Sequence, residues 1–257
     1  MIARRALLAG MAGLAMGPRI GRAGPTPDDP LQSVNWGLMR EAFLGDAPFV
    51  FDDKVSVTAP TSAEDAMQVP FLIDATRLSR VLRILVFADL NPINRILDFT
   101  PGRLAPVLAA RFKIQQATPL RAAALDGQGR WHVGGLWIDA MGGGCTAPAL
   151  AHGEADWTAR LGETSVRVFD REGRKRIRLQ IRHPMDTGLA AGIPAFFIEQ
   201  LVLTDAAGEV LGELATSEPV SENPLFTFEL PTALGLSEVG IRARDNNGNV
   251  FSRKVTL

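Results

Sequence analysis

Short apolar and β-branched runs recur along this chain, and residues typical of turns follow most of them. In the first half the turns contain Asn91-Pro92, Pro101-Gly102 and Asp126-Gly127. This alternation predicts short antiparallel strands, as in a β-sandwich. The predicted strands of this half are 54–59, 69–75, 81–88, 108–114, 120–125 and 131–139.

The second half has the same pattern without repeating the sequence. Its turns are centred on Gly173, Gly208 and Gly248. The predicted strands are 164–169, 176–182, 196–204, 209–215, 225–230, 238–244 and 250–256. These pieces suffice for a second immunoglobulin-like sandwich.

Only the stretch 31–44 has helical spacing, with Leu31, Val34, Leu38 and Phe43 on one side. The sequence therefore predicts a mainly β protein of two immunoglobulin-like sandwiches, with a short N-terminal helix on the first. The predicted domains are 24–140 and 161–257. Residues 141–160, rich in Gly, Ala and Pro, are predicted to form a linker between them.

The first 23 residues are predicted to be an export signal. Arg4-Arg5 precedes a glycine-diluted apolar run, and small residues follow it. The paired arginines favour the twin-arginine route over the general secretory one. A membrane anchor is the alternative, but the run is shorter than the roughly 20 residues that a spanning helix needs. We therefore expect a periplasmic protein with no membrane span in the mature chain.

The charge balance argues against a nucleic-acid partner. The full chain has 27 Lys and Arg against 28 Asp and Glu. Removing residues 1–23 removes four arginines and no acid, so 23 basic residues remain and the net charge falls from -1 to -5.

Cys145 is the only cysteine, and it directly follows Gly142, Gly143 and Gly144. Exported proteins usually pair their structural cysteines, so a single one is incidental, intermolecular or chemically active. A glycine run offers no side chains to pack around a thiol. We therefore expect an exposed Cys145 on a flexible glycine arm. Because no cation is close in sequence, we expect its pKa to stay near 8.5.

The remaining candidate residues are weaker. The three histidines, His132, His152 and His183, lack the spacing of a helical metal pair, so we predict no metal site and no cofactor beyond a covalent sulfur adduct. His183 and Met185 are predicted to shape a turn and an interface between the domains. Arg176 and Arg178 lie on the polar side of an alternating strand. A solvated strand face explains them, and steering of an acidic partner or an anionic sulfur compound is the alternative.

Several segments resemble the Sox sulfur-oxidation family. The first half is similar to the sulfur-carrier subunit SoxY, and the second to its partner SoxZ. The SoxY-like residues are Trp36, Phe49, 63–66, Val69-Pro70, Asp89, Asn91-Pro92 and the glycine-flanked Cys145, and the SoxZ-like residues are 183–188, 192–195, 221–224, Asp245 and Gly248. The chain thus resembles the fused SoxYZ-like carriers named for their association with quinoprotein dehydrogenases.

This resemblance implies a periplasmic carrier that does not turn over alone. Cys145 would hold sulfur intermediates covalently, as a persulfide or thiosulfonate, for separate oxidising enzymes and cytochromes, and possible partners include a quinoprotein dehydrogenase system. The resemblance also implies that the two domains pack on each other. In the two-subunit family the cysteine lies in a free carboxyl-terminal tail, whereas here the chain continues past Thr146. An arm held at both ends must enter a partner doubled.

Two other classes of function stay open. The first is an accessory module that binds a periplasmic quinoprotein dehydrogenase and has an incidental cysteine. The second is a thiol-dependent enzyme, which would have to turn over alone. The sequence lacks a nucleophile elbow, a phosphate loop and a dinucleotide fingerprint, which argues against the enzyme.

Overall fold

The computed structural model describes residues 28–153 and 155–257. These residues form two stacked sheets, with one α-helix, α1 (Trp36–Phe43), near the start of the described part. The predicted mainly β class with two β-sandwich domains is confirmed. The predicted export signal, residues 1–23, lies outside the described residues. Among the described residues no helix is both long enough and apolar enough to cross a membrane.

The larger sheet contains nine strands in the order β1-β8-β7-β4-β5-β12-β11-β14-β15. All but one of its neighbouring pairs are antiparallel, and β1 runs parallel to β8. Its strands are β1 (Phe49–Phe51), β4 (Val81–Ala88), β5 (Arg95–Thr100), β7 (Thr118–Asp126), β8 (Trp131–Ile138), β11 (Ile198–Thr204), β12 (Val210–Thr216), β14 (Glu238–Asp245) and β15 (Val250–Thr256).

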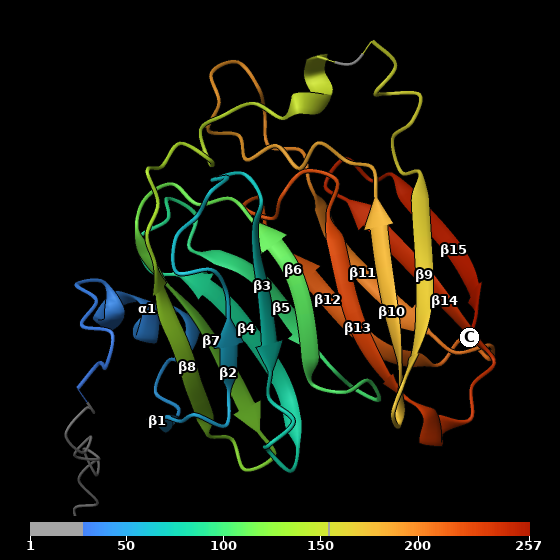
Figure 1. The fold of residues 1–257 in the computed structure, drawn as a ribbon, viewed down its shortest axis with the longest axis horizontal. Coiled ribbons are helices and arrows are strands. Elements are labelled where there is room, and N and C mark those ends of the chain that lie inside the picture. Colours follow the sequence, from blue (N-terminus) through green and yellow to red (C-terminus); the bar gives the residue numbers. More distant parts are fainter. Residues whose placement is uncertain (1–27, 154) are drawn as a thin grey trace, which may run out of the picture.

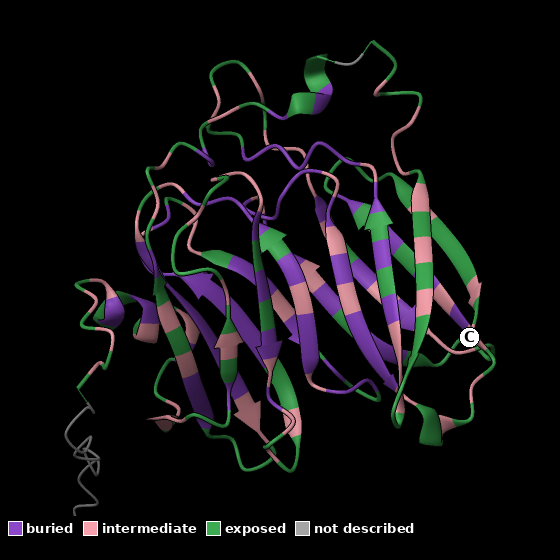
Figure 2. Ribbon diagram, in the orientation of Figure 1, coloured by how far each residue is buried: buried purple, intermediate pink, exposed green. Residues whose placement is uncertain are grey.

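The smaller sheet contains six strands in the order β2-β3-β6-β13-β10-β9. Figure 1 shows β3, β6, β13, β10 and β9 side by side across the molecule. Its strands are β2 (Ser56–Thr58), β3 (Val69–Asp74), β6 (Val107–Phe112), β9 (Thr164–Arg171), β10 (Arg174–Ile181) and β13 (Leu225–Pro231). Buried residues alternate with more exposed ones along β3 and β10 (Figure 2), as expected for strands with one face in the core.

The two halves of the chain share both sheets. In the larger sheet β5 pairs with β12, so that Phe99 lies opposite Leu214. In the smaller sheet β6 pairs with β13, and Leu108 lies opposite Phe228. The rings of Phe99 and Phe228 are 5.9 Å apart across the junction. One cluster of buried apolar residues therefore runs through both halves.

Helix α1 covers the outer face of the larger sheet through Trp36 and Met39, which pack near Phe87 and Trp131. The predicted apolar side of the helix was wrong, because Val34 and Leu38 are exposed. The observed side is set by Trp36, whose ring lies 4.6 Å from the Arg121 guanidinium carbon.

Arg121 is the centre of a buried ion network. Its Nε lies 3.0 Å from both carboxylate oxygens of Asp89, and its terminal nitrogens donate to Asp29 at 2.9 and 2.7 Å. The side chain of Arg121 is 1% exposed and that of Asp89 is fully buried. This network fixes the segment before α1 to the sheet.

Candidate functional site

The loop that contains Cys145 runs over one end of the sandwich. We call residues 141–153 the cysteine strap; it ends in a 3-10 turn, η1 (Leu150–Gly153). In Figure 1 it is the yellow-green segment above the sheets. Loops from both halves of the chain contact it, as its hydrogen bonds show.

Cys145 itself is fully buried, which contradicts the expected exposed thiol. Its Sγ lies 3.4 Å from the Lys113 carbonyl oxygen. Its backbone N–H donates to Gln115 Oε1 at 3.1 Å, and its carbonyl oxygen accepts from the Thr187 hydroxyl at 2.6 Å. Polar atoms of both halves therefore hold the cysteine in place.

The expected flexible arm of Gly142, Gly143 and Gly144 is instead packed against the chain after β6. The Gly144 N–H donates to the Ile114 carbonyl at 3.0 Å, and that of Gly143 to Gln115 at 3.3 Å. Gly142 and Gly143 both have positive φ, which favours glycine. The glycines here allow the backbone of the strap to approach its neighbours closely. The sequence alone does not show whether a glycine run serves such packing or flexibility.

Gly144→Ala should displace the strap. An added Cβ would lie 2.0 Å from the Ala66 carbonyl oxygen, a backbone atom that cannot rotate away. Overpacking of this kind costs about 1–3 kcal/mol. Since 1.4 kcal/mol is tenfold in an equilibrium constant, we expect iodoacetamide to label Cys145 roughly tenfold faster in the variant.

Gly153→Ala is the matched control, because a Cβ at Gly153 meets no atom within 4 Å. Its labelling rate should match that of the wild type. Equal rates for Gly144→Ala and the wild type would contradict the close packing of Gly144.

A buried lysine lies beside the cysteine. Lys113 is fully buried, and its Nζ donates to the Met185 carbonyl oxygen at 2.5 Å. Burial lowers the pKa of Lys113, while Asp186, the Cys145 thiol when it is ionised, and Glu222 oppose that shift. Burial raises the pKa of the Cys145 thiol to about 11, and the Lys113 charge opposes it. The thiol is therefore protonated, and unreactive, at neutral pH.

Two carboxylates of the second half hold the far end of the strap. Glu222 accepts the backbone N–H groups of Leu150 and Ala151 at 2.7 and 2.9 Å. Asp186 binds His152 Nε2 at 2.8 Å and accepts a longer bond from Ala149. Hydrogen bonds to charged acceptors are stronger than neutral ones, so each of these bonds should contribute more than the neutral bonds around Cys145.

The segments that carry the family resemblance converge on this site. From the first half, Asn91 donates to the Lys113 carbonyl at 2.9 Å and accepts the Gln115 N–H at 2.9 Å. From the second half come Asp186, Thr187 and Glu222, whose contacts are given above. Cys145 thus lies where motifs of both halves meet.

His183 and Met185 lie beneath the strap and are both buried. His183 Nδ1 accepts the Met185 N–H at 3.1 Å, so its proton is on Nε2, 3.5 Å from Asp245. Burial lowers the pKa of His183 to about 4, against the pull of Asp245. Through its carbonyl oxygen Met185 joins the second half to Lys113 of the first. Arg176 and Arg178 lie on β10, outside this site.

Sequence reasoning gave no role to several residues of the site. Asn91, Asp186, Thr187 and Glu222 were present only as parts of family motifs. Lys113 gave no signal, because it follows Arg111 on the polar side of the alternating strand and the pattern alone predicts a solvated side chain. Within residues 28–153 and 155–257 no three metal-ligating side chains gather in a way that could hold an ion.

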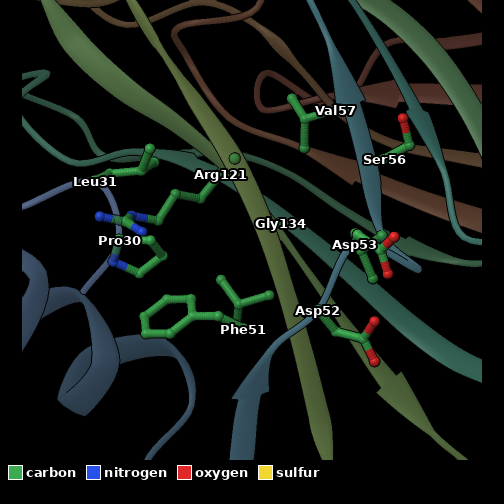
Figure 3. A pocket seen from close by; sticks show the side chains of 12 residues that line it. Pro30, Leu31, Phe51, Asp52, Asp53, Ser56, Val57, Arg121 and Gly134 are labelled. Atoms are coloured by element: carbon green, nitrogen blue, oxygen red, sulfur yellow. The ribbon is translucent and has the colours of Figure 1, made fainter. Parts of the chain in front are cut away.

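A separate pocket of about 410 Å³ lies beside β1, β2 and β8 (Figure 3). Phe51 and Leu31 contribute apolar walls, and Asp52 lies on the other side of the strand that carries Gly134. Its Arg121 is already bound by the two aspartates described above. None of its lining residues belongs to the cysteine strap.

Comparisons with known proteins agree with both halves of the resemblance. The family model of the sulfur oxidation protein SoxY matches residues 40–145, and it ends on Cys145. The family model of the sulphur oxidation protein SoxZ matches residues 167–256.

No curated protein matches the sequence significantly. A solved structure of the sulfur carrier protein SoxY from Chlorobium limicola f thiosulfatophilum is 18% identical, with a TM-score of 0.38 over 42% of this chain and 96% of that one. The two family matches carry the assignment: this chain joins a SoxY-family domain and a SoxZ-family domain in one polypeptide.

Proposed function

We propose that this protein is a periplasmic sulfur carrier that holds sulfur intermediates covalently on Cys145 and does not turn over alone. The SoxY and SoxZ matches support a carrier role in sulfur oxidation. The observation that carries the assignment to Cys145 is the meeting of both domains' motif residues around this one thiol.

In this proposal the observed arrangement is the closed state, and the cysteine strap opens to load and unload. The strap buries few large apolar side chains, since Met141 is fully exposed and Leu150 is 76% exposed. Most of the contacts that attach the strap are hydrogen bonds, whose net contribution is about 1 kcal/mol each and more for charged acceptors. Segments with little apolar burial open at low cost in free energy. Met141 and Leu150 are also free to contact a partner enzyme.

The chemistry of loading needs no other group of this chain. The Cys145 thiolate attacks a polysulfide, one S–S bond of the polysulfide breaks, and a persulfide and a polysulfide shorter by one sulfur are left, without net oxidation. Loading of thiosulfate is different, because the thiol and thiosulfate form a new S–S bond with release of one proton and two electrons. A partner cytochrome of the sulfur-oxidising enzymes would accept those electrons.

Intact mass after exposure to polysulfide tests the proposal. We expect the reduced wild-type protein to gain the mass of one or more sulfur atoms, and dithiothreitol to remove it. Cys145→Ser should gain nothing under the same conditions. The carrier function would be refuted if the mass stayed unchanged both in the wild type and in a variant with an opened strap, such as Gly144→Ala.

The complete burial of Cys145 favours one alternative. A cysteine that only packs the strap would suit an accessory module that binds a periplasmic quinoprotein dehydrogenase. That function requires Cys145→Ser to bind the dehydrogenase as the wild type does, and it requires the sulfur-mass experiment to fail.

A further inference from the structure

The outer face of the smaller sheet is rich in arginine. Along β6, β10 and β13 the side chains that alternate with buried ones point away from the core, and along β9 they alternate with half-buried ones. Six of them are arginines, and we call this set the arginine face: Arg111, Arg167, Arg171, Arg174, Arg176 and Arg178. The carboxylates at outward positions of these strands and of β3 are Asp74 and Glu229.

Most of these arginines have no carboxylate partner within residues 28–153 and 155–257. Arg176 is paired with the buried Glu229, 2.6 Å away. Among the described residues, none of the other five forms an ion pair with a carboxylate. This excess of positive charge lies on a chain whose overall charge is slightly negative.

The strand register places like charges directly opposite each other. Arg178 lies opposite Arg167, and Arg174 lies opposite Arg171. Like charges in such cross-strand pairs are destabilising. A solvated strand face gains nothing from this arrangement, whereas carboxylates of a bound partner would relieve the repulsion.

The arginine face also has a shallow groove with an apolar floor. The groove, of about 290 Å³, crosses the junction between the two halves. Pro70, Leu72 and Ala109 supply apolar surface beside Arg111 and Arg178. In Figure 2 the strands β3, β6, β13 and β10 around it carry intermediate and exposed residues between the buried ones.

The groove lies next to the cysteine site along the chain. Arg111 is two residues before Lys113. The Arg111 carbonyl oxygen accepts the N–H of Ser221, and Ser221 precedes Glu222, which holds the strap. At the same end, Ala66 packs against Gly144. A molecule bound in the groove therefore lies beside the loops that hold Cys145.

We propose that the arginine face is the docking surface for an acidic partner protein. Carboxylates of the partner pair with the arginines that have no internal counter-charge, and apolar side chains occupy the groove. Complementary charge of this kind speeds association and orients the partner. The further idea that such a partner acts on Cys145 rests on the proposed carrier function. The docking surface itself does not depend on that function.

A fluorescent oligoglutamate peptide is the probe for this surface. We expect it to bind the mature protein at low salt, to bind less tightly as salt rises, and to bind far better than an oligoglutamine peptide. Reversing three charges of the face, in Arg167→Glu/Arg174→Glu/Arg178→Glu, should weaken binding by about tenfold or more, which is about 1.4 kcal/mol.

The control reverses three arginines elsewhere, in Arg130→Glu/Arg242→Glu/Arg253→Glu. These residues are exposed and form no ion pair among the described residues, and the net charge changes equally. The control should keep most of the affinity, and thermal unfolding should show that both variants are folded. Equal losses in both variants, or none in the face variant, would overturn the proposal.

Two further probes separate the classes of partner. If anionic lipid vesicles or duplex DNA bind the arginine face more tightly than the peptide does, the partner is not an acidic protein and the proposal fails. Cys145→Ser should bind the peptide as the wild type does. Equal binding by this variant would show that the peptide test does not depend on sulfur chemistry. The docking proposal can therefore be judged separately from the mass experiment.

Discussion

Iodoacetamide should label Cys145 at least a hundredfold more slowly in the folded protein than in the unfolded one at pH 8. The closed strap excludes the reagent, because the cysteine is fully buried. Burial also raises the thiol pKa to about 11. Relative to an ordinary thiol with a pKa near 8.5, this lowers the thiolate fraction at pH 8 by roughly 240-fold. Mass spectrometry of timed samples measures both rates.

The pH dependence of labelling also tests whether the strap is closed and the pKa of the thiol raised. Closure of the strap raises the pKa of the thiol, so the protonated thiol stabilises the closed state. This stabilisation is complete below about pH 8.5 and is lost as the pH rises toward the pKa of the thiol in the closed state. If labelling occurs through the open state, the rate should keep rising tenfold per pH unit beyond 8.5 and level off only near 11.

An exposed cysteine one position further along is the matched control. Thr146 is exposed, so Thr146→Cys in a Cys145→Ser background places a thiol on the outer side of the same strap. It should label almost as fast as an unfolded chain, with a rate that levels off near pH 8.5. A wild-type profile that already levels off there would contradict the closed state.

Arg121→Met should be the most destabilising single substitution that we predict. It would leave Asp89 and Asp29 buried without their counter-charge. Removal of one partner from a buried ion network costs about 3–5 kcal/mol. The free energy of unfolding, from urea titration followed by circular dichroism, measures the loss.

Arg83→Met is the comparison for an exposed pair. Arg83 binds Asp98, but its side chain is 44% exposed, so the cost should be at most about 1 kcal/mol. Adding Asp29→Asn and Asp89→Asn to Arg121→Met should restore part of the lost stability, because both buried charges disappear. Equal losses for Arg83→Met and Arg121→Met would show that the buried network does not stabilise the fold.

Most of the fold could be predicted from local sequence patterns. Strands β4 and β15 occupy the predicted ranges 81–88 and 250–256, and the other predicted strands differ by a few residues at their ends. Strand β1 was missed because its three residues are too few to show a period. Strand β5 was missed although Pro101-Gly102 follows it, because Asp98 interrupts its apolar run.

The surroundings of Cys145 could not be predicted in the same way. A glycine run permits both a loose tether and close backbone packing, and the positions of the Ala66 and Ile114 carbonyl groups distinguish the two at Gly144. Burial of the thiol likewise depends on Lys113 and Thr187, which are distant from it in sequence. The family motifs identified several residues of the site without showing how they meet.

The sharing of both sheets bears on how the chain must mature. Thr100 and Glu213 become neighbours across a separation of more than a hundred residues, so the central pairings close late, and contacts of this kind slow folding. Until the second half emerges, β5 and β6 are open edges that invite pairing with other chains. Because both halves belong to one polypeptide, the correct partner strands stay close to these edges, which lowers the risk that a newly made molecule aggregates.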